Sequence, residues 1–544
     1  VYPMQTPDQI RYLLTHSDAK VILVDGPAEL ESVLAAAPAA PGLAAIVPWT
    51  ADLYQAARAR DPRIVDPAGL AGPPLDPAEL RARGEARAPE DVALLVYTSG
   101  TTGPPKAAMI SHGNVLALLR AYGPHADFRE SDLALSFLPM AHVAERILSF
   151  YGRVDIGVAG AYATSIAAVL GELLEVQPTL FGAVPRLFEK AHARIVAELG
   201  KKPALVRRLF RWAEGVARRA LPYRLAGRPL PAARALQHRL ADRLVLARIR
   251  AAFGGRVQRL IVGAAPIDRA ILEFFWAVGL PIYEAFGMTE ATVVTHINLP
   301  GAVRLGTVGR PLPGMEQRLA DDGELLLRGP WVFLGYFKDP DATAAAVVDG
   351  WLHTGDIAAI DPDGYLTIKD RKKHLIITAG GKNLAPAAIE GAIKAQDPLI
   401  SHVHAHGDRR PYVTALVAPS PLETLDFGLA RGILAQGEVD ALTRELVANP
   451  AARSDALATA MARVVVHPEL RRRLQVAVAR GNAHLAHVEQ VRRFVVLARD
   501  LSQEQGELTP TLKVKRRERE RAYAADLARL YDDPEFGLAP DPAP

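Results

Sequence analysis

The chain has 544 residues, too many for one compact core, so we expect at least two domains. Its hydrophobic fraction of 49% and charged fraction of 23% are ordinary for a globular enzyme, and its net charge of +4 gives no reason to expect nucleic-acid binding. The absence of cysteine excludes disulfides, thiolate catalysis and cysteine-ligated metal sites, and it agrees with a reducing cytoplasm.

The first two thirds of the chain alternate short apolar runs with helical patterns, which predicts an α/β domain. A helix over residues 8–16 precedes a strand at 19–24, and further strands are expected at 92–97 and 260–263. Ligands gather outside the carboxyl ends of strands in open α/β sheets, so the loops after the last two strands are expected to converge. Because the chain opens at Val1, we expect that an earlier stretch of this domain is missing.

No segment has the pattern of a secretory signal or a transmembrane helix. The nearest candidate, residues 156–171, is too short and is interrupted by glycine and hydroxyl side chains. We predict that it forms a buried strand and a turn.

Basic residues are concentrated between positions 201 and 250, where 14 Lys or Arg accompany only Glu214 and Asp242. The same stretch carries apolar side chains, namely Leu209, Phe210, Trp212, Leu221 and Tyr223. One interpretation is a solvated helical face. The other is a surface that rests on anionic lipid at the inner face of the membrane.

After about residue 305 the pattern changes to short alternating strands, expected at 323–328 and 365–369, with a hairpin turn at 361–364. A smaller domain is expected from about residue 370. It should contain a strand at 375–378, a glycine pair and a helix after Pro386, followed by mostly helical residues at 421–495 and a Pro-rich, disordered tail at 538–544.

The strongest chemical signal is the loop Tyr97-Thr-Ser-Gly-Thr-Thr-Gly-Pro-Pro-Lys106. A strand followed by alternating Thr, Ser and Gly supplies backbone N–H groups and hydroxyls that can surround phosphate oxygens, and glycine permits close approach. The lysine adds a positive charge. The spacing is not that of a Walker A loop, so the loop indicates phosphate binding without a P-loop fold.

This loop resembles the signature of the adenylate-forming (AMP-binding) superfamily, which includes acyl-CoA synthetases, luciferases and peptide-synthetase adenylation domains. Four later segments resemble further motifs of that family in the same order. They are Tyr283–Glu290, Trp351–Asp356, Asp370–Lys373 with Gly380–Asn383 and Pro386, and Leu508–Lys513. The resemblance implies a large α/β adenylation domain over 1–369 and a smaller, mobile α+β domain over 370–544.

The resemblance also implies an enzyme that uses ATP and Mg²⁺ to convert a carboxylic acid into an acyl-adenylate. Phosphate would be held by Thr98, Ser99, Gly100, Thr101, Thr102, Gly103 and Lys106. Phe286 would stack on adenine beside the turn Gly263, Ala264 and Ala265, within a nucleotide-binding segment that includes Glu284, Ala285 and Gly287. Thr289 would bond the α-phosphate, and Glu290 with Thr102 would hold magnesium. Asp356 would accept the ribose hydroxyls, and Arg371 would donate to ribose or phosphate.

The family also implies two poses of the C-terminal domain, which rotates about a hinge at Asp370. In the first pose Lys513 enters between the anionic carboxylate and the α-phosphate, where its charge lowers the barrier to adenylation. In the second, Gly380, Gly381 and Lys382 approach the pantetheine arm of coenzyme A. His374 stands where the family usually has Asp, which leaves a hinge salt bridge in question.

Three segments resemble the long-chain fatty acyl branch: Phe137–Arg146, Val184–Lys190 and the basic helical insertion around Trp212. The first places His142 near the carboxylate end of the substrate, although it could equally be a structural histidine. We therefore expect a long-chain fatty acid–CoA ligase. The alternatives are a ligase for medium-chain, aromatic, bile-acid-like or other acids, a luciferase-like oxygenase, or an adenylation domain that feeds a separate carrier protein. A decayed binding module is disfavoured because Lys106, Glu290, Asp356, Arg371 and Lys513 are all present.

Overall fold

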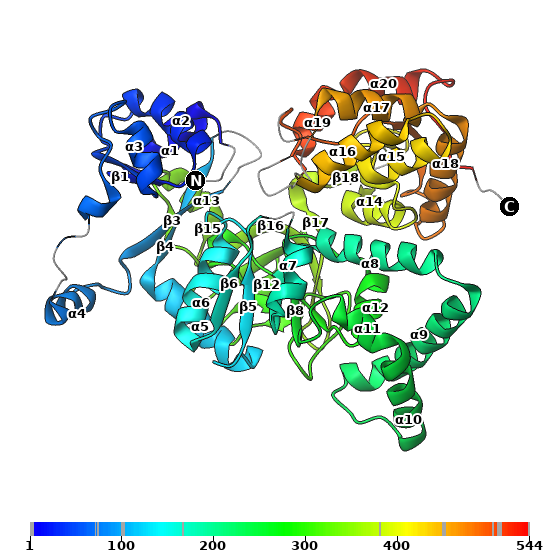
Figure 1. The fold of residues 1–544 in the computed structure, drawn as a ribbon, viewed down its shortest axis with the longest axis horizontal. Helices are drawn as coiled ribbons and strands as arrows, with labels where there is room; N and C mark the ends of the chain where they lie inside the picture. Colours follow the sequence, from blue (N-terminus) through cyan, green and yellow to red (C-terminus); the bar gives the residue numbers. More distant parts are fainter. Residues whose placement is uncertain are drawn as a thin grey trace.

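The computed structural model describes residues 5–70, 72, 76–98, 104–165, 168–379, 382–448, 453–502, 505–508 and 514–541. Buried apolar side chains gather into separate clusters: one within residues 10–64, a large one from Val96 to Leu366, and others after Ile376. Figure 1 shows the corresponding N-terminal, central and C-terminal parts of the ribbon. The domain boundary expected at residue 370 stays a prediction.

The N-terminal part packs helices on a parallel pair of strands. Its elements are α1 (Pro7–His16), β1 (Val21–Val24), α2 (Pro27–Ala36), β2 (Ala45–Pro48) and α3 (Ala51–Ala57). Helix α1 begins where expected because Thr6 and Gln9 form a capping box. The helix contacts the loop region directly, since the Tyr12 hydroxyl donates to the Pro105 carbonyl at 3.0 Å.

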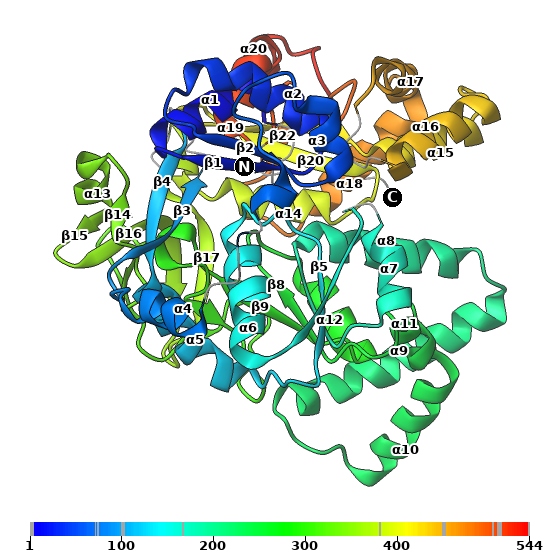
Figure 2. The ribbon, with the colours of Figure 1, turned by 60° about the vertical axis from the view of Figure 1, so that its left-hand side comes forward.

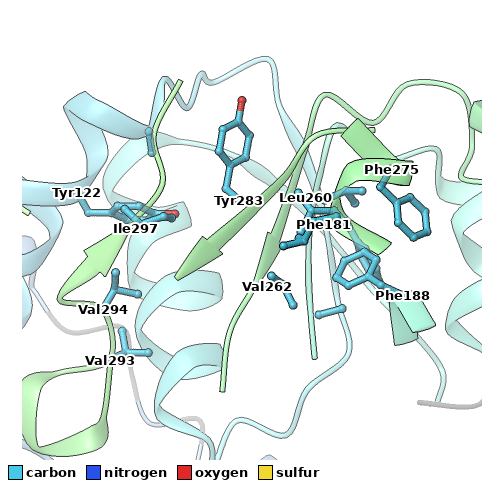
Figure 3. Close-up of a cluster of buried hydrophobic side chains, with 14 of the residues drawn as sticks. Tyr122, Phe181, Phe188, Leu260, Val262, Phe275, Tyr283, Val293, Val294 and Ile297 are labelled. Atoms are coloured by element: carbon cyan, nitrogen blue, oxygen red, sulfur yellow. The ribbon is translucent and has the colours of Figure 1, made fainter. Parts of the chain in front are cut away.

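The largest sheet within the described residues has the strand order β11-β10-β9-β8-β7-β5-β6, parallel from β6 to β9. Its strands are β5 (Leu133–Ser136), β6 (Ala159–Tyr162), β7 (Leu180–Ala183), β8 (Arg259–Val262), β9 (Ile282–Phe286), β10 (His296–Ile297) and β11 (Arg310–Pro311). Helices α5 (His112–Ala126), α6 (Gly152–Ile156), α7 (Val169–Val176), α8 (Pro185–Gly200) and α12 (Arg269–Val278) accompany it. Figure 3 shows Phe181, Leu260 and Val262 of this sheet near Phe188 and Phe275, whose rings meet edge to face.

One expectation about this region is wrong. Residues 156–171 were expected to be buried, but β6 is the edge strand of the sheet and is largely exposed.

The strand that leads into the Gly/Thr loop is not part of the parallel sheet. It forms an antiparallel pair of β3 (Val92–Thr98) with β4 (Lys106–Ser111), joined by β14 (Gly335–Tyr336). Within the described residues β3 pairs with β4, the next strand along the chain, and β14 joins the other edge of β4. The apolar pattern of one strand does not reveal such a pairing.

A further sheet contains β12 (Glu316–Leu319), β13 (Glu324–Arg328), β15 (Val347–Val348), β16 (Trp351–Ile360) and β17 (Leu366–Arg371), with α13 (Pro340–Ala346) beside it. The expected hairpin turn joins β16 to β17. Asp361 accepts from the Tyr365 N–H at 2.9 Å through its side chain, and Gly364 takes a φ of 84° that favours glycine.

The C-terminal part has a sheet in the order β20-β21-β22, with β20 (Ile400–His406), β21 (Val413–Pro419) and β22 (Val491–Val496). Around it lie β18 (Ile376–Ile377), β19 (Asn383–Leu384), α14 (Pro386–Lys394), α15 (Pro421–Ala430), α16 (Gln436–Ala448), α17 (Asp455–Val465), α18 (Pro468–Asn482), α19 (Arg516–Ala522) and α20 (Ala524–Asp532). The stretch 421–495 is helical as expected except at its end, where β22 pairs in parallel with β21.

The basic stretch is helical. It comprises α9 (Ala204–Leu225), α10 (Ala232–Ala241), a π-helical turn at Asp242–Leu246 and α11 (Ala247–Ala251). Figures 1 and 2 show that α9 and α10 project from the central part, away from the C-terminal part. Among the described residues, no helix is long and apolar enough to cross a membrane.

Candidate active site

Lys106, Tyr336 and Glu290 form a connected group beside the Gly/Thr loop. The Tyr336 hydroxyl donates to Glu290 Oε1 at 2.8 Å, and Lys106 Nζ lies 5.1 Å from the centre of the Tyr336 ring. Lys106 is also 3.7 Å from Asp339 Oδ2. Burial and the charge of Glu290 raise the pKa of Tyr336, so its hydroxyl stays a donor. The predicted phosphate lysine and the predicted magnesium ligand therefore share one tyrosine, which the sequence analysis did not identify.

The backbone brings Glu290 to this position through a short 3₁₀ turn, Thr289–Ala291, which follows β9. The Glu290 carbonyl accepts from the Phe333 N–H at 2.9 Å, just before β14. A Cβ at Gly287 would lie 1.5 Å from the Val293 carbonyl oxygen, so only glycine fits there. The turn thus depends on Gly287 packing directly against the returning chain.

Residues expected to surround the adenine follow neighbouring parallel strands. Gly263 follows β8, and Ala285 and Phe286 end β9. A Cβ on Gly263 would meet the Ala285 carbonyl at 3.2 Å, so the Gly263–Ala265 turn lies against β9, and Ala264 adopts a φ of 69°. The Phe286 ring is half-buried and lies 6.0 Å from the His296 ring. The Gly263 turn and the end of β9 thus lie side by side, and the stacking role of Phe286 stays a prediction. The convergence expected between this turn and the Gly/Thr loop also stays a prediction, because residues 99–103 lie outside the described residues.

Glu284 is placed differently from the other predicted nucleotide residues. Its carboxylate is buried and accepts from the Gly306 N–H at 3.0 Å, which ties β9 to the following loop. Burial raises the pKa of Glu284 to about 8. The side chain therefore has a structural contact within the protein.

Asp356 and Arg371 form an ion pair on neighbouring strands. Arg371 Nε lies 2.6 Å from Asp356 Oδ1, and the two residues are Cα partners in the β16–β17 ladder. Asp356 is buried, whereas the Arg371 side chain is 42% exposed. The expected ribose acceptor is thus held in place by the expected phosphate or ribose donor.

Lys373 is coupled electrostatically to both of these charged groups. Burial lowers its pKa, the nearby positive charges of Arg371 and Arg517 lower it further, and Asp356 and Glu290 act in the opposite direction. A single lysine is therefore within electrostatic reach of both the Asp356 pair and the Glu290 group. No role was predicted for Lys373 within its motif, because three of its electrostatic neighbours, Asp356, Glu290 and Arg517, come from distant segments.

Asp370, the expected hinge residue, is anchored on the C-terminal side. One carboxylate oxygen accepts from the Ala387 N–H at 2.8 Å, which makes Asp370 a cap for the first turn of α14. His374 Nδ1 lies 4.0 Å from Asp370 Oδ1, and burial lowers the pKa of His374 to about 4, so a neutral histidine occupies the position where Asp was expected. The neighbouring Lys372 bonds Asp322 at 2.5 Å and Glu324 at 2.9 Å.

A second contact joins the parts on either side of the hinge. Lys394, at the end of α14, lies 2.7 Å from Glu189 of α8. Helix α14 is thus fixed at its start by Asp370 and at its end by the central part, in the pose that the structure describes.

The remaining predicted site residues are more dispersed. The Thr98 hydroxyl donates to the Lys106 carbonyl at 3.3 Å, Lys382 is exposed and its N–H donates to Thr378, and His142 lies beyond β5 with Nδ1 accepting from the Ala144 N–H at 3.2 Å. Predicted residues that lie outside the described residues are Ser99, Gly100, Thr101, Thr102, Gly103, Gly380, Gly381 and Lys513. Arg516 and Arg517, which follow Lys513, lower the pKa values of His374 and Lys373, so α19 begins beside the hinge.

Comparison with known proteins agrees with this arrangement. Residues 1–337 match the family model described as AMP-binding enzyme, and residues 373–427 match that of the AMP-binding enzyme C-terminal domain. The chain belongs to the AMP-binding enzyme family.

Relatives of this AMP-binding enzyme include the long-chain-fatty-acid–CoA ligase FadD15 of Mycobacterium bovis, 35% identical over 98% of this chain and 83% of that protein. The long-chain-fatty-acid–CoA ligase ACSBG1 of Mus musculus is 32% identical over 95% of this chain and 72% of its own length. Among solved structures, the adenylation domain of a carboxylate reductase from Mycobacterium chelonae matches with a TM-score of 0.66 and 23% identity, over 97% of this chain and 75% of that one. The last match shows that the fold is that of adenylate-forming enzymes.

Proposed function

We propose that this AMP-binding enzyme is a long-chain fatty acid–CoA ligase. A carboxylate oxygen of the fatty acid attacks the α-phosphorus of ATP and pyrophosphate leaves, which gives the acyl-adenylate. The sulfur of coenzyme A then attacks the acyl carbon, AMP leaves and the thiol proton is released. The observation that carries the proposal is the Asp356–Arg371 pair across β16 and β17, which holds a ribose acceptor in place in a chain of the AMP-binding enzyme family.

Different residues among those described bind different parts of ATP. Asp356 accepts the ribose diol, with Arg371 fixing its carboxylate, and Phe286 covers adenine beside the Gly263 turn. Lys106, oriented by the Tyr336 ring, holds phosphate oxygens through its charge. Thr289 bonds the α-phosphate. These contacts hold the phosphorus in place for in-line attack, which is the main catalytic task in such transfers.

The donor set near the phosphates suits magnesium, because it offers a carboxylate oxygen and no sulfur. Glu290 would hold the ion together with Thr102, and Tyr336 fixes the orientation of that carboxylate at 2.8 Å. Mg²⁺, when bound, neutralises negative charge on the phosphate oxygens.

We assign to Lys513 the task of neutralising, with its positive charge, the negative charge that develops during adenylation. Support comes from its neighbours in sequence, since Arg517 is within electrostatic reach of Lys373 and hence of the nucleotide residues. Rotation about Asp370 would then bring Gly380, Gly381 and Lys382 toward coenzyme A. The rotation must break the Lys394–Glu189 contact, which belongs to the pose described here.

The acyl group is proposed to be a long-chain fatty acid because two relatives that cover most of this chain carry that substrate in their names. His142 would lie at the carboxylate end. It follows β5 in the same sheet whose strands β8 and β9 carry the Gly263 turn and Phe286, so these residues share one edge of the sheet. We also propose a cytoplasmic location with contact to the membrane through residues 201–250, in agreement with the lack of cysteine and with the basic helices.

A chain-length series tests this proposal. AMP release that depends on coenzyme A is measured with saturated acids of increasing length at fixed ATP and Mg²⁺. We expect the highest kcat/KM with long chains. Activity confined to short or aromatic acids would assign the enzyme to another acyl substrate, and acyl transfer to a carrier protein without transfer to coenzyme A would favour the carrier-feeding alternative.

A further inference from the structure

The projecting basic helices contain a cavity that the proposed reaction does not use. It has a volume of about 390 Å³ and is lined by Arg224, His238, Arg239, Asp242, Arg243, Arg250 and Gly279. Four of the seven lining residues are arginines and one is an acid, so the cavity is strongly cationic. It lies between α9, the α10–α11 segment and the end of α12.

Part of this charge is used to build the cavity wall. Arg250 binds both oxygens of Asp242, at 2.6 and 2.8 Å, which neutralises the acid. Arg224 donates to the carbonyls of Trp276 and Ala277 at the end of α12, where a cation is favoured by the helix dipole. Its other nitrogen meets His238 Nε2 at 2.9 Å. Burial and the neighbouring Arg224 lower the pKa of His238, so the histidine is neutral at neutral pH and adds no charge to the cavity.

Arg239 and Arg243 complete the rim. They are exposed, lie one helical turn apart, and have no ion pair or hydrogen bond with any residue that the structure describes. Arg239 and Arg243 lie beside Arg224, which backbone carbonyls hold, and Arg250, which pairs with Asp242. The two exposed guanidinium groups are therefore the ones that can bind an anion, and their geometry matches that of phosphate oxygens.

An apolar stripe runs along the same helical segment. Leu236, Leu240 and Leu244 follow a spacing of four residues, so they share one face, and they are 70%, 51% and 37% exposed. Helix α9 adds Leu205 and Trp212, which are also exposed. A free phosphate compound in water would make no contact with such an apolar stripe. A surface with exposed leucines next to unpartnered arginines is instead complementary to a bilayer, which offers an apolar interior below a layer of phosphates.

We propose that the α10 segment, residues 232–251, docks on an anionic phospholipid membrane. Its leucines at 236, 240 and 244 enter the acyl region. Arg239 and Arg243 bind the phosphate of a lipid headgroup at the mouth of the Arg224 cavity. Figures 1 and 2 show α10 at the outer end of the molecule, opposite the C-terminal part, so docking leaves the rotation about Asp370 unobstructed. The inference rests on the proposed function, since a long-chain fatty acid is stored in the bilayer and would be taken from there.

The test is co-sedimentation of the full chain with phosphatidylcholine vesicles that contain, or lack, about 30% phosphatidylglycerol. Arg239→Gln with Arg243→Gln should weaken binding to the anionic vesicles about 10- to 30-fold, because each basic residue at the surface contributes a factor of about five. Leu236→Ser with Leu240→Ser should weaken it at least about tenfold through lost apolar burial. Arg471→Gln with Arg480→Gln, which removes two exposed charges from α18 in the C-terminal part, is the matched control and should change it less than about twofold.

Activity measurements separate this inference from the proposed function. With a short, water-soluble acid all variants should match the wild type, which also shows that they are folded. With a long-chain acid supplied in anionic vesicles, only the two α10 variants should lose activity. Equal vesicle binding by the α10 variants and the wild type would overturn the proposed site. The site would also be overturned if Arg239→Gln abolished binding of inorganic phosphate but left vesicle binding unchanged. If the chain bound vesicles through α10 but ligated no fatty acid, the proposed function would be wrong and the docking site would still be correct.

Discussion

Arg371 and Asp356 are direct partners across the β16–β17 ladder, and their side chains meet at 2.6 Å one residue after the hinge position Asp370. The buried carboxylate is thus attached to the segment about which the C-terminal part is expected to rotate. Because Asp356 is the proposed ribose acceptor, nucleotide binding and the hinge share one ion pair. A change at Asp356 should therefore affect nucleotide binding.

Asp356→Asn should weaken ATP binding about 10- to 100-fold, since it replaces a charged acceptor of two hydroxyls with a neutral one. Isothermal titration with ATP and Mg²⁺ measures the change. Asp349→Asn, at an exposed turn before β16, is the matched control and should bind ATP like the wild type. Unchanged affinity in the Asp356 variant would exclude a ribose contact.

Tyr336→Phe should lower kcat for adenylation about tenfold and leave the KM for the fatty acid unchanged. The substitution removes the hydroxyl that orients Glu290 but keeps the ring under Lys106. Tyr336→Leu, which removes both contacts, should be slower still. Tyr54→Phe in the N-terminal cluster serves as the control. If the Phe variant were as fast as the wild type, the Tyr336–Glu290 bond would have no part in catalysis.

Glu284→Gln should make the protein more stable at pH 8 but not at pH 4.5. Burial raises the pKa of Glu284 from 4.5 to about 8, so the folded state keeps a proton that the unfolded chain releases. The stability that Glu284 contributes is full below pH 4.5 and is lost as the pH rises to about 8. Glutamine cannot ionise and still offers an oxygen to the Gly306 N–H.

Thermal unfolding of both proteins across this pH range measures the effect. The Tm of the variant should exceed that of the wild type by several degrees at pH 8, and the two values should meet near pH 4.5. A difference that stays constant with pH would mean that Glu284 is ionised in the folded protein.

Local signals in the sequence were sufficient for much of the fold. The helix α1, which begins at the capping box of Thr6 and Gln9, and the turn at Asp361–Gly364 depend on a few neighbouring residues, and both lie where predicted. The pairing of β3 was not predicted, because its partner β4 returns antiparallel after the loop and β14 joins β4 more than two hundred residues later. The exposure of β6 depends on its place at the edge of the sheet, which a short apolar run does not specify.

The same limit applies to the site. Motif order brought Lys106, Glu290, Asp356 and Arg371 into one hypothesis, but it gave no reason to include Tyr336, which is a lone tyrosine between aromatic neighbours. Its role follows from the antiparallel pairing of β14 with β4 and from the Phe333 bond to the Glu290 carbonyl. Lys373 likewise gains its position from the packing of η6 (Lys372–His374) beside the start of α19.

Lys513→Ala should abolish formation of the acyl-adenylate and leave thioester formation from supplied acyl-AMP intact, because the lysine is assigned to the first half-reaction alone. The two half-reactions are measured separately, by pyrophosphate release and by acyl-CoA formation. Lys515→Ala, two residues further on, is the control and should retain both activities. Failure of the Lys513 variant to use supplied acyl-AMP would remove this assignment.

The central claim is that the enzyme adenylates a fatty acid, and fatty-acid-dependent exchange of labelled pyrophosphate into ATP tests it without coenzyme A. The account predicts rapid exchange with a long-chain fatty acid and Mg²⁺, exchange that needs more ATP in Asp356→Asn, and exchange reduced to background in Lys513→Ala. Release of ADP and phosphate, or no exchange with any carboxylic acid, would contradict it.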